Sequence, residues 1–461
     1  MLTKNKLIST LKKELSTENV LDTFEERYAY AQDATNLRDI KNIPDVVVFV
    51  ESIEEVQKVV KLANQYKTPI ICRGAGTNVV GACSTEHGGI ILNFSKMNKI
   101  KEINPENMTA IVEPGVILGD FQKEVEKLGL FYPPDPSNLA VSTIGGSIAQ
   151  NSAGAKSFKY GTTKDYVIDL KVVTADGKIL KTGANTIKNA TGYNLTSLFT
   201  GSEGTLGIIC EATLKLITKP QSRKVIMAYF NTVQEAVKAV NSIIEQRICP
   251  ATIDFMDKNA MTTIEKFYPS GLLIDKDASL IIEIDGFECS INYQQDIIVN
   301  ILNNCNASAI QASNNEDEYE KIWKARRCSM AACARLKPNV TTDDIIVPRE
   351  NLAKLVLGTR QICEKYSLDV CLIGHIGDGS VHPQIPINYN DEDEYKRYKL
   401  AKCEIYDLTA KLGGILSGEH GIGSEKRPHI DKVINSVALE HMRLIKKSFD
   451  PNNILNPYKI F

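Results

Sequence analysis

The sequence contains neither a long apolar run nor a marked excess of one charge. Its 461 residues include 54 lysines and arginines and 56 aspartates and glutamates, which gives a formal net charge of −2 at pH 7. This balance gives no reason to expect nucleic acid or an anionic membrane surface as a partner. No apolar stretch approaches the roughly 18 residues that a helix needs to cross a bilayer, so we also expect no membrane span.

Paired cysteines and an export signal are missing as well. The eleven cysteines form no C-x-x-C pair, which argues against an iron–sulfur cluster in this chain. The N-terminal residues have the leucine spacing of an amphipathic helix, with Leu7 and Leu11 in one stripe, but they lack the apolar centre of a signal peptide. We therefore expect a cytoplasmic protein with reduced thiols.

Glycine, in contrast, is concentrated in three segments of the first half of the chain. These are residues 72–78 (CRGAGTN), 139–161 (LAVSTIGGSIAQNSAGAKSFKYG) and 200–207 (TGSEGTLG), where glycine alternates with hydroxyl and amide side chains. Such segments let backbone N–H groups approach a phosphorylated ligand closely, although a glycine-rich segment taken alone is more often a turn. Three of them in succession indicate one extended ligand, such as FAD, contacted from several sides.

The pattern before the first glycine segment predicts a strand, a helix and a strand. Residues 46–50 are apolar, Ser52 and Glu55 form a capping-box signature, and residues 69–72 are again apolar. We interpret this as a β-α-β unit with a parallel pair of strands. No helical periodicity follows residues 73–76, which disfavours a nicotinamide-dinucleotide fold.

The remaining chain divides at a boundary near residues 219–222. Before it we expect a hairpin at 169–181, with its turn at Ala175-Asp176-Gly177. After it, strand and helix patterns alternate again, which is typical of a separate cap domain. The acidic run at 314–321 predicts a solvated helix start, and residues 436–449 a final helix.

Three of the six histidines lie in two glycine-flanked motifs. His375 and His382 enclose a glycine turn in GHIGDGSVH, and Glu419 and His420 lie in SGEHGIG. Two imidazoles and one carboxylate can form a divalent metal site for Zn²⁺, Fe²⁺ or Mn²⁺ with open positions for substrate oxygens. Structural hydrogen bonding by the histidines is the alternative, and the residues alone favour neither.

Several of these runs together resemble a known family. PIICRGAGTNVVG, PPDPSN, TIGGSIAQNSAG, YGTTKDYVIDLKVV and FTGSEGTLGII are similar to segments of the FAD-binding oxidoreductases of the vanillyl-alcohol oxidase type. The resemblance is strongest to the D-lactate dehydrogenase, glycolate oxidase flavin-subunit and D-2-hydroxyglutarate dehydrogenase branch, and it extends from about Val20 to the C-terminus.

The resemblance implies an α+β fold. A two-part FAD-binding domain of the vanillyl-alcohol oxidase (PCMH) type carries an α/β cap domain, and a C-terminal helical segment returns to the flavin. The expected divisions are an N-terminal helical segment at 1–41, the FAD-binding domain at 42–221, the substrate or cap domain at 222–412 and the C-terminal segment at 413–461.

The resemblance also implies roles for individual residues. It makes His375, His382 and Glu419 the metal ligands, His420 the base beside the flavin, and Arg326 the group that binds the substrate carboxylate. Without the match, Arg326 reads equally as a surface arginine on a helix. The expected FAD contacts are Arg73, Gly74, Ala75, Gly76, Thr77, Asn78, Gly81, Pro136, Ser137, Thr143, Gly145, Gly146, Asn151, Ala153, Gly154, Gly161, Glu203, Gly204, Gly207, Ile208 and Ile209.

The expected cofactors are noncovalent FAD and a divalent metal. Covalent relatives carry a histidine in the first glycine segment, where this chain has none, and His87 lies too far along to replace it. The expected reaction is the oxidation of a small D-2-hydroxy acid to the 2-oxo acid. In it the metal lowers the pKa of the hydroxyl, histidine takes the proton and flavin N5 takes the hydride.

Electrons are expected to leave to a partner, either an electron transfer flavoprotein or an iron–sulfur subunit. The alternatives are a glycolate oxidase, a D-2-hydroxyglutarate dehydrogenase, a subunit that holds FAD only to relay electrons, and a non-redox flavoenzyme such as an ether-lipid synthase. The metal and base motifs count against the relay subunit, which needs neither.

The expected size of the substrate follows from one difference between this chain and the 2-hydroxyglutarate enzymes of the family. The 2-hydroxyglutarate enzymes hold the distal carboxylate with a hydroxyl residue four places after the arginine and with a lysine further on. An ungapped comparison puts Met330 at the first position and residues 341–344 at the second, where Asp343 and Asp344 would repel a carboxylate. We therefore expect D-lactate before glycolate or D-2-hydroxybutyrate, unless a shift in alignment brings Lys337 into the pocket.

Overall fold

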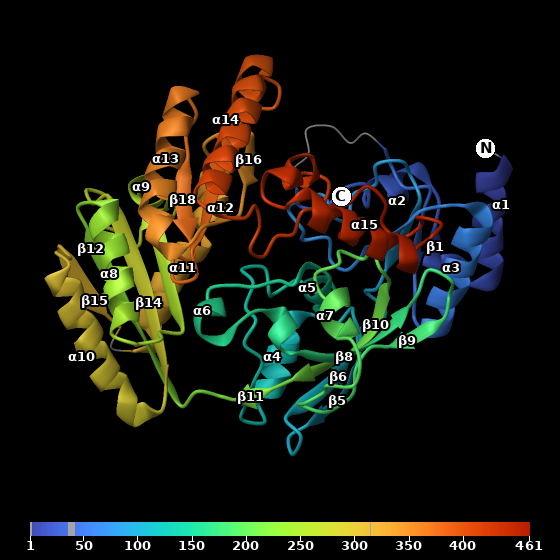
Figure 1. Ribbon diagram of the computed structural model, residues 1–461, viewed down its shortest axis with the longest axis horizontal. Helices are drawn as coiled ribbons and strands as arrows, with labels where there is room; N and C mark the ends of the chain where they lie inside the picture. Colours follow the sequence, from blue (N-terminus) through green and yellow to red (C-terminus); the bar gives the residue numbers. More distant parts are fainter. Residues whose placement is uncertain (1, 36–41, 314) are drawn as a thin grey trace.

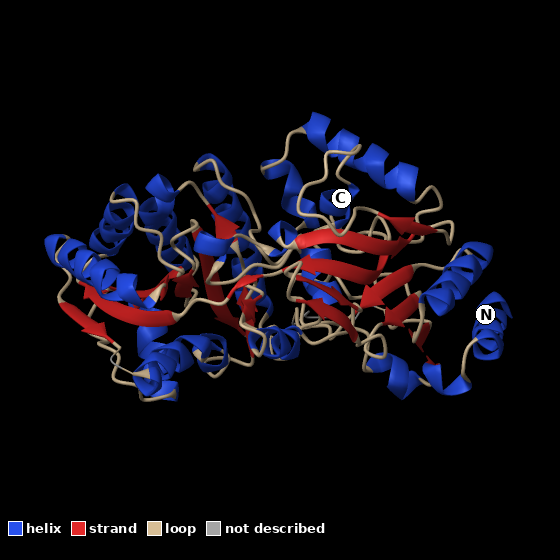
Figure 2. Ribbon diagram, turned by 90° about the horizontal axis from the view of Figure 1, so that it is seen from below, coloured by secondary structure: helices blue, strands red, loops and turns tan. Residues whose placement is uncertain are grey.

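The computed structural model describes residues 2–35, 42–313 and 315–461, which form two lobes side by side (Figures 1 and 2). The expected segments at 1–41 and 314–321 therefore lie partly outside the described residues, at positions 1, 36–41 and 314. No helix in the described ranges combines the length and the apolar character needed to cross a membrane.

The first lobe begins with helix α1 (Leu2–Glu14), which packs on α3 (Ile53–Tyr66) through buried Leu7 and Leu11. Leu15, just after the helix, is buried in the same core. A four-stranded sheet follows, in the spatial order β1 (Val20–Leu21), β2 (Val46–Phe49), β4 (Ile90–Asn93) and β3 (Ile70–Arg73). The expected β-α-β unit is confirmed, and its two strands are parallel, but they are not neighbours, because β4 lies between β2 and β3 and is parallel to both. A strand that arrives later in the chain fills the central place, which local periodicity cannot reveal.

The second sheet of this lobe is antiparallel. Its order is β5 (Ile100–Asn104), β6 (Thr109–Val112), β10 (Ile208–Lys215), β8 (Val167–Val173) and β9 (Ile179–Lys181), and β7 (Leu130–Phe131) pairs separately with β11 (Ile217–Thr218). The expected hairpin is confirmed, since β8 and β9 pair and the Thr174 N–H donates to the Lys178 carbonyl at 2.9 Å. The helices of the lobe are α1 (Leu2–Glu14), α2 (Phe24–Tyr28), α3 (Ile53–Tyr66), α4 (Leu118–Glu126), α5 (Ile144–Gln150), α6 (Ser157–Tyr160) and α7 (Leu195–Phe199), with 3₁₀ turns η1 (Thr17–Asn19) and η2 (Thr163–Asp165).

The glycine segment at 139–161 is partly helical, whereas the sequence analysis treated it as a loop. Helix α5 begins at Thr143, whose hydroxyl accepts a hydrogen bond from the Gly146 N–H at 3.3 Å. This N-cap offsets the low helix propensity of the glycines. The segment therefore contains two short helices, α5 and α6, with irregular backbone between them.

The second lobe is built on an eight-stranded sheet whose pairings are all antiparallel. Its order is β15 (Ala309–Ala312), β12 (Ser222–Phe230), β14 (Ala278–Gly286), β13 (Thr252–Asp257), β18 (Cys371–Gly374), β19 (Ser380–Ile387) and β16 (Asn339–Thr342), with β17 (Ile345–Ile346) also paired to β19.

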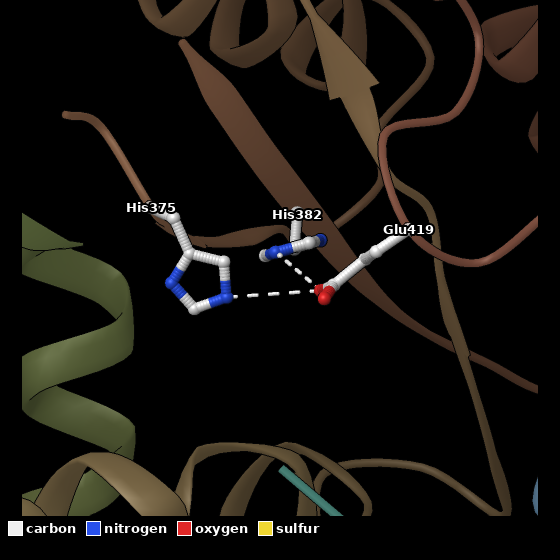
Figure 3. Close-up of side chains that lie close together, drawn as sticks. All are labelled: His375, His382 and Glu419. Atoms are coloured by element: carbon white, nitrogen blue, oxygen red, sulfur yellow. Dashed lines mark ion pairs between the residues drawn. The ribbon is translucent and has the colours of Figure 1, made fainter. Parts of the chain in front are cut away.

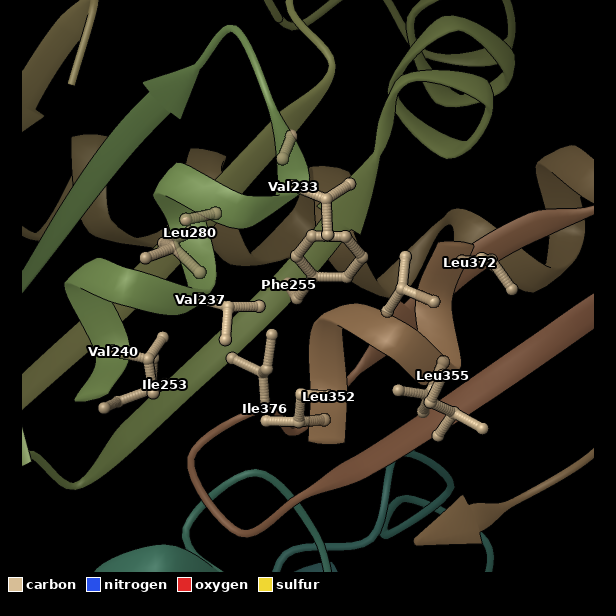
Figure 4. Packing of buried hydrophobic residues seen from close by; sticks show 14 of the residues in the cluster. Val233, Val237, Val240, Ile253, Phe255, Leu280, Leu352, Leu355, Leu372 and Ile376 are labelled. Atoms are coloured by element: carbon tan, nitrogen blue, oxygen red, sulfur yellow. The ribbon is translucent and has the colours of Figure 1, made fainter. Parts of the chain in front are cut away.

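Helices cover both faces of this sheet. The main core lies under α8 (Val233–Glu245), α10 (Glu288–Asn304), α13 (Leu352–Lys365) and α14 (Glu392–Lys411), where Val233, Phe255 and Leu355 pack together (Figure 4). The opposite face is covered by α9 (Lys258–Phe267), α11 (Glu316–Arg327) and α12 (Ser329–Cys333). A 3₁₀ turn, η3 (Arg349–Asn351), precedes α13.

After α14 the chain returns to the first lobe through η4 (Arg427–Lys432) and α15 (Ser436–Phe449), drawn in red in Figure 1. The Ile70 N–H donates to the Ile454 carbonyl at 2.7 Å, and the Asn456 N–H donates to the Ile70 carbonyl at 2.8 Å. The last residues thereby extend the edge of the four-stranded sheet at β3. This return brings the 417–423 motif against the glycine segments.

Candidate active site

A cavity of about 910 Å³ is lined by both lobes and by the returning segment. The glycine-hydroxyl segments form a large part of its wall, and one end holds His375, His382, Glu419, His420 and Arg326. The expected FAD contacts that line it are Arg73, Gly74, Ala75, Gly76, Thr77, Asn78, Pro136, Ser137, Thr143, Gly145, Gly146, Glu203, Gly204, Gly207 and Ile209. The others, which are not among the lining residues, are Gly81, Asn151, Ala153, Gly154, Gly161 and Ile208.

The wall fits a large polar ligand such as FAD. Three buried lining atoms, Ser142 Oγ, Ser147 Oγ and Gln150 Oε1, have no hydrogen-bond partner in the described part of the chain. Buried polar atoms are rarely left unpaired, so a bound ligand with donors and acceptors is their natural complement. A side chain at Gly74 would put a Cβ 2.1 Å from Thr143 Oγ1, which shows how closely the segments approach one another.

No histidine of the first half contacts this wall. The His87 ring packs edge-on against Tyr458, with centroids 4.5 Å apart, and is not a lining residue. Burial raises the pKa of the nearby thiols of Cys72 and Cys83 to about 12, which keeps both protonated and unreactive.

Three side chains at the histidine end converge on one point (Figure 3). One ligand atom each from His375, His382 and Glu419 lie within 4.8 Å of one another. Glu419 Oε1 is 3.7 Å from His375 Nε2 and 3.4 Å from His382 Nε2. The turn between the two histidines depends on Gly379, which has a φ of +100° and lies against the Val347 carbonyl. Two imidazoles and a carboxylate at this spacing fit a first-row divalent cation with positions left for substrate oxygens.

The two histidines differ in protonation. Burial would lower the pKa of His375, but Asp254 and Glu419 outweigh it and hold the pKa well above its ordinary value. Burial lowers the pKa of His382 to about 4. The carboxyl of Glu419 has a lowered pKa, because His375 and its other histidine neighbours outweigh burial. The cluster therefore offers one neutral imidazole and a carboxylate, and an entering cation would displace the proton of His375.

Asp344 fixes the loop that carries Glu419 and His420. Its Oδ2 atom accepts hydrogen bonds from Ser417 Oγ at 2.9 Å and from three successive backbone N–H groups, those of Gly418 (2.7 Å), Glu419 (2.7 Å) and His420 (3.1 Å). Burial opposes ionisation of Asp344, but the proximity of His420 and Lys426 and the backbone hydrogen bond from Glu419 hold its pKa well below the usual range. The backbone of the 417–420 loop is thus held by hydrogen bonds to the ionised carboxylate of Asp344.

His420 contacts both the His375–His382–Glu419 group and the first glycine segment. Its ring stacks on His382 with centroids 5.2 Å apart, and its Nε2 atom lies 3.6 Å from Glu419 Oε1. The Asn78 side chain donates to the His420 carbonyl at 3.1 Å. The buried Nδ1 atom has no partner within the described residues, so one ring nitrogen is available for a bound group.

Arg326 is buried, so the alternative interpretation of it as a surface arginine on a helix is wrong. It is 8% exposed, lines the cavity, and its Nε atom lies 2.7 Å from Asp254 Oδ2. Neither atom makes a hydrogen bond of acceptable angle in the described ranges, so the contact is an ion pair.

Asp254 itself was missed by the sequence analysis. It lies in β13, 1% exposed, and its second oxygen is hydrogen-bonded to His375 Nδ1. An aspartate inside the apolar run ATIDFMD was the available signal. A charged residue in a buried strand needs partners, and here they are two site residues.

A second missed group lies on the cavity wall between the lobes. Tyr319 donates to Glu283 Oε2 at 2.7 Å, and Lys156 Nζ lies 3.8 Å from Asp135 Oδ2 and 4.0 Å from Glu283 Oε1. Burial raises the pKa of the Asp135 carboxyl to about 6. The ammonium group of Lys156 is thus already compensated by two carboxyl groups. Two further cations among the described lining residues are also paired, Arg223 with Glu316 and Arg327 with Glu320.

The residues expected to limit substrate size are only partly at the cavity. Met330 and Thr342 line it. Asp343 and Asp344 do not, contrary to the expectation that they would face a substrate: Asp344 holds the 417–420 loop, and Asp343 lies 2.9 Å from Lys426 Nζ. Lys337 is bound to Glu394 and does not line the cavity.

Comparisons with known proteins agree with this geometry. Residues 44–183 match the family described as an FAD binding domain, and residues 219–460 match the family of FAD linked oxidases, C-terminal domain. The chain is 40% identical to glycolate oxidase subunit GlcD of Bacillus subtilis, over 96% of this chain and 94% of that protein. It is 33% identical to the mitochondrial D-lactate dehydrogenase [cytochrome] of Arabidopsis thaliana, over 98% and 80%.

Two further comparisons define the breadth of the family. The chain is 30% identical to D-2-hydroxyglutarate dehydrogenase of Stutzerimonas stutzeri, over the full length of both. Among solved structures, p-cresol methylhydroxylase with substrate bound has the same fold, with a TM-score of 0.86 at 19% identity over 99% of this chain and 96% of that one. The chain therefore belongs to the FAD-linked oxidases, with the two-part FAD-binding fold of the vanillyl-alcohol oxidase type.

Proposed function

We propose that the protein is an FAD-dependent dehydrogenase that oxidises a small D-2-hydroxy acid, D-lactate in first place, to the 2-oxo acid. One observation carries the proposal: His375, His382, Glu419, His420 and Arg326 meet at one end of a cavity whose remaining wall fits FAD. A relay subunit would need the FAD wall but not this group of side chains. The relatives named above include dehydrogenases or oxidases of three 2-hydroxy acids.

Each side chain has a role in this proposal. His375, His382 and Glu419 would hold a divalent metal, which supplies Lewis-acid chemistry at the substrate hydroxyl when bound. FAD, held noncovalently, supplies the hydride acceptor when bound. Arg326 binds the substrate carboxylate, and His420 takes the hydroxyl proton at its free ring nitrogen.

The lining of the pocket supports a small monocarboxylic substrate. Met330 cannot hydrogen-bond a distal carboxylate, and Lys337 is bound elsewhere. The lining cations Lys156, Arg223 and Arg327 are each already paired with carboxylates of the protein. A buried carboxylate without a partner costs several kcal/mol, so D-2-hydroxyglutarate is disfavoured. Asp343 and Asp344 are not lining residues, so they do not repel a carboxylate in the cavity.

Glycolate is a second candidate. It is smaller than lactate by one methyl group, so the same pocket would admit it, and the 40% identity to the Bacillus subtilis glycolate oxidase subunit favours it. A hydrophobic pocket gains only about 1–3 kcal/mol from one methyl group, so we expect a preference of roughly 10-fold to 200-fold for D-lactate.

The proposal includes a partner and a compartment. Electrons would pass to an electron transfer flavoprotein or to an iron–sulfur subunit, since the eleven cysteines of this chain are all free thiols and none forms a cluster motif. Free thiols throughout also support a reducing, cytoplasmic setting.

Steady-state kinetics with an artificial acceptor test the proposal. The FAD- and metal-loaded protein should show its highest kcat/KM with D-lactate, a lower value with glycolate, and the lowest with L-lactate and D-2-hydroxyglutarate. A higher kcat/KM for the dicarboxylate would refute the size argument. Full activity in a metal-free preparation would refute the metal role.

A further inference from the structure

One buried carboxylate contacts both the substrate-binding and the metal-binding parts of the site. Asp254, at 1% exposure in the interior of β13, is hydrogen-bonded through Oδ1 to His375 Nδ1, and its Oδ2 lies 2.7 Å from Arg326 Nε. The three residues come from β13, the end of β18 and α11, so only the tertiary fold brings them together.

The contact with His375 decides which ring nitrogen faces the cluster. Because Asp254 occupies Nδ1, the other nitrogen, Nε2, points to Glu419 Oε1 at 3.7 Å. A carboxylate acceptor keeps a proton on Nδ1, so Nε2 is the nitrogen that would lose its proton and bind a metal.

The contact with Arg326 fixes the base of the guanidinium group. Asp254 lies 2.7 Å from Nε, and this nitrogen makes no hydrogen bond within the described ranges. The terminal nitrogens therefore remain for a bidentate contact with a carboxylate. The spacing between this contact and the metal cluster is then set by the two oxygens of one rigid carboxylate.

We propose that Asp254 is a positioning residue that orients Arg326 and His375 together and so matches the site to acids whose carboxylate and hydroxyl are on adjacent carbons. The inference rests on the proposed function and extends it to a residue that touches neither substrate nor metal. It also explains why a charged side chain is retained in the middle of a buried strand.

Asp254→Asn and the matched control Asp257→Asn test the proposal on the FAD-loaded protein. Asp257 lies in the same strand, is fully buried and is paired with Arg360 Nε at 3.1 Å, but it does not line the cavity. We expect Asp254→Asn to weaken Mn²⁺ binding by about 10-fold to 100-fold and to raise the KM for D-lactate by a similar factor, with FAD content unchanged. Asp257→Asn should change only thermal stability.

A ligand-free readout separates this inference from the proposed function. Among the histidine ring signals of ¹⁵N-histidine-labelled, metal-free protein, one Nδ1–H should disappear in Asp254→Asn and persist in Asp257→Asn, whatever the substrate proves to be. If wild-type protein binds no Mn²⁺ and oxidises no hydroxy acid, the proposed function fails while this signal still decides the positioning role. An unchanged ring signal, or equal losses of Mn²⁺ affinity in both variants, would overturn the inference.

Discussion

At the scale of single residues, the proposed function assigns metal binding and proton transfer to different histidines. His382 is buried with a pKa of about 4, so it is a neutral ligand at any physiological pH, whereas His420 keeps a free ring nitrogen beside it. Two stacked imidazoles can thus have different roles because their surroundings differ. The distinction leads to two substitutions with different expected results.

Replacing His382 by Ala should remove one of the three ligands. We expect bound metal and activity to fall together, by about 100-fold or more in activity, while FAD stays bound, since the glycine wall is untouched. Metal analysis and the flavin absorbance of the same sample measure both. His441→Ala is the control, because that histidine is exposed on α15. Metal content equal to wild type in the His382 variant would contradict the assignment.

Replacing His420 by Asn should leave metal and flavin in place and slow the reaction itself. The expected loss is roughly 10²-fold to 10⁴-fold in the rate of flavin reduction, as for other general bases. Anaerobic stopped-flow mixing with D-lactate measures that rate directly. An unchanged rate would move the role of base to another group.

At the scale of elements, strand β13 contributes residues both to the main core of the second lobe and to the cavity. Its residues alternate. Ile253 and Phe255 face the main core under α8 and α13 (Figure 4). Asp254, between them, lines the cavity. The position of Asp254 therefore depends on packing behind the sheet.

Truncating Phe255 to Ala should cost about 3–5 kcal/mol in the free energy of unfolding, because the ring is fully buried in that core. The fraction of the variant that remains folded should bind Mn²⁺ with an affinity close to that of the wild type. Denaturant unfolding and Mn²⁺ titration of the same variant check both expectations. A loss below about 1 kcal/mol would show that the core tolerates the cavity.

A cross-strand charge group in the first lobe has a pH signature. Glu211 on β10 lies 2.7 Å from Lys101 Nζ and 2.6 Å from Lys171 Nζ, and these contacts outweigh burial and lower its pKa. A lowered carboxyl pKa stabilises the fold above the unfolded value of about 4.5, and this stabilisation is lost as the pH falls through the lower folded value. Glu211→Gln should therefore cost about 1 kcal/mol at pH 7, and the difference from wild type should shrink below pH 4.5. Unfolding curves at both pH values measure it.

Local patterns explain what could be predicted at this scale. The hairpin at 169–181 and the His375–His382 turn are contiguous, so composition and spacing reveal them. Asp254 is 121 residues from its partner His375, and β4 enters its sheet between strands that precede it in the chain. Neither relation has a local signal, because each is decided by which surfaces the folded chain brings together.

At the scale of the whole molecule, the returning C-terminal segment holds the 417–423 motif against the third glycine segment. Glu203 of the third glycine segment accepts hydrogen bonds from the Ile422 N–H at 2.7 Å and the Gly423 N–H at 2.9 Å, immediately after Glu419 and His420. The two-lobe arrangement was predictable from the family resemblance, whereas this contact required the structure.

FAD itself should be released by denaturation. No histidine lies on the FAD wall of the first lobe, and the lining thiols of Cys72 and Cys83 are held protonated by burial. We expect acid precipitation to leave all of the yellow colour in the supernatant. Colour that remains in the pellet would show a covalent bond.

The central claim is that this chain both holds FAD and oxidises a hydroxy acid with it. Anaerobic addition of D-lactate to the FAD- and Mn²⁺-loaded protein tests it most directly. We predict that the oxidised flavin band bleaches with D-lactate, that it bleaches far more slowly with L-lactate, and that pyruvate forms in equal amount. A flavin band that stays oxidised with D-lactate, glycolate and D-2-hydroxyglutarate alike would contradict the account and favour an electron-relay subunit or a non-redox flavoenzyme.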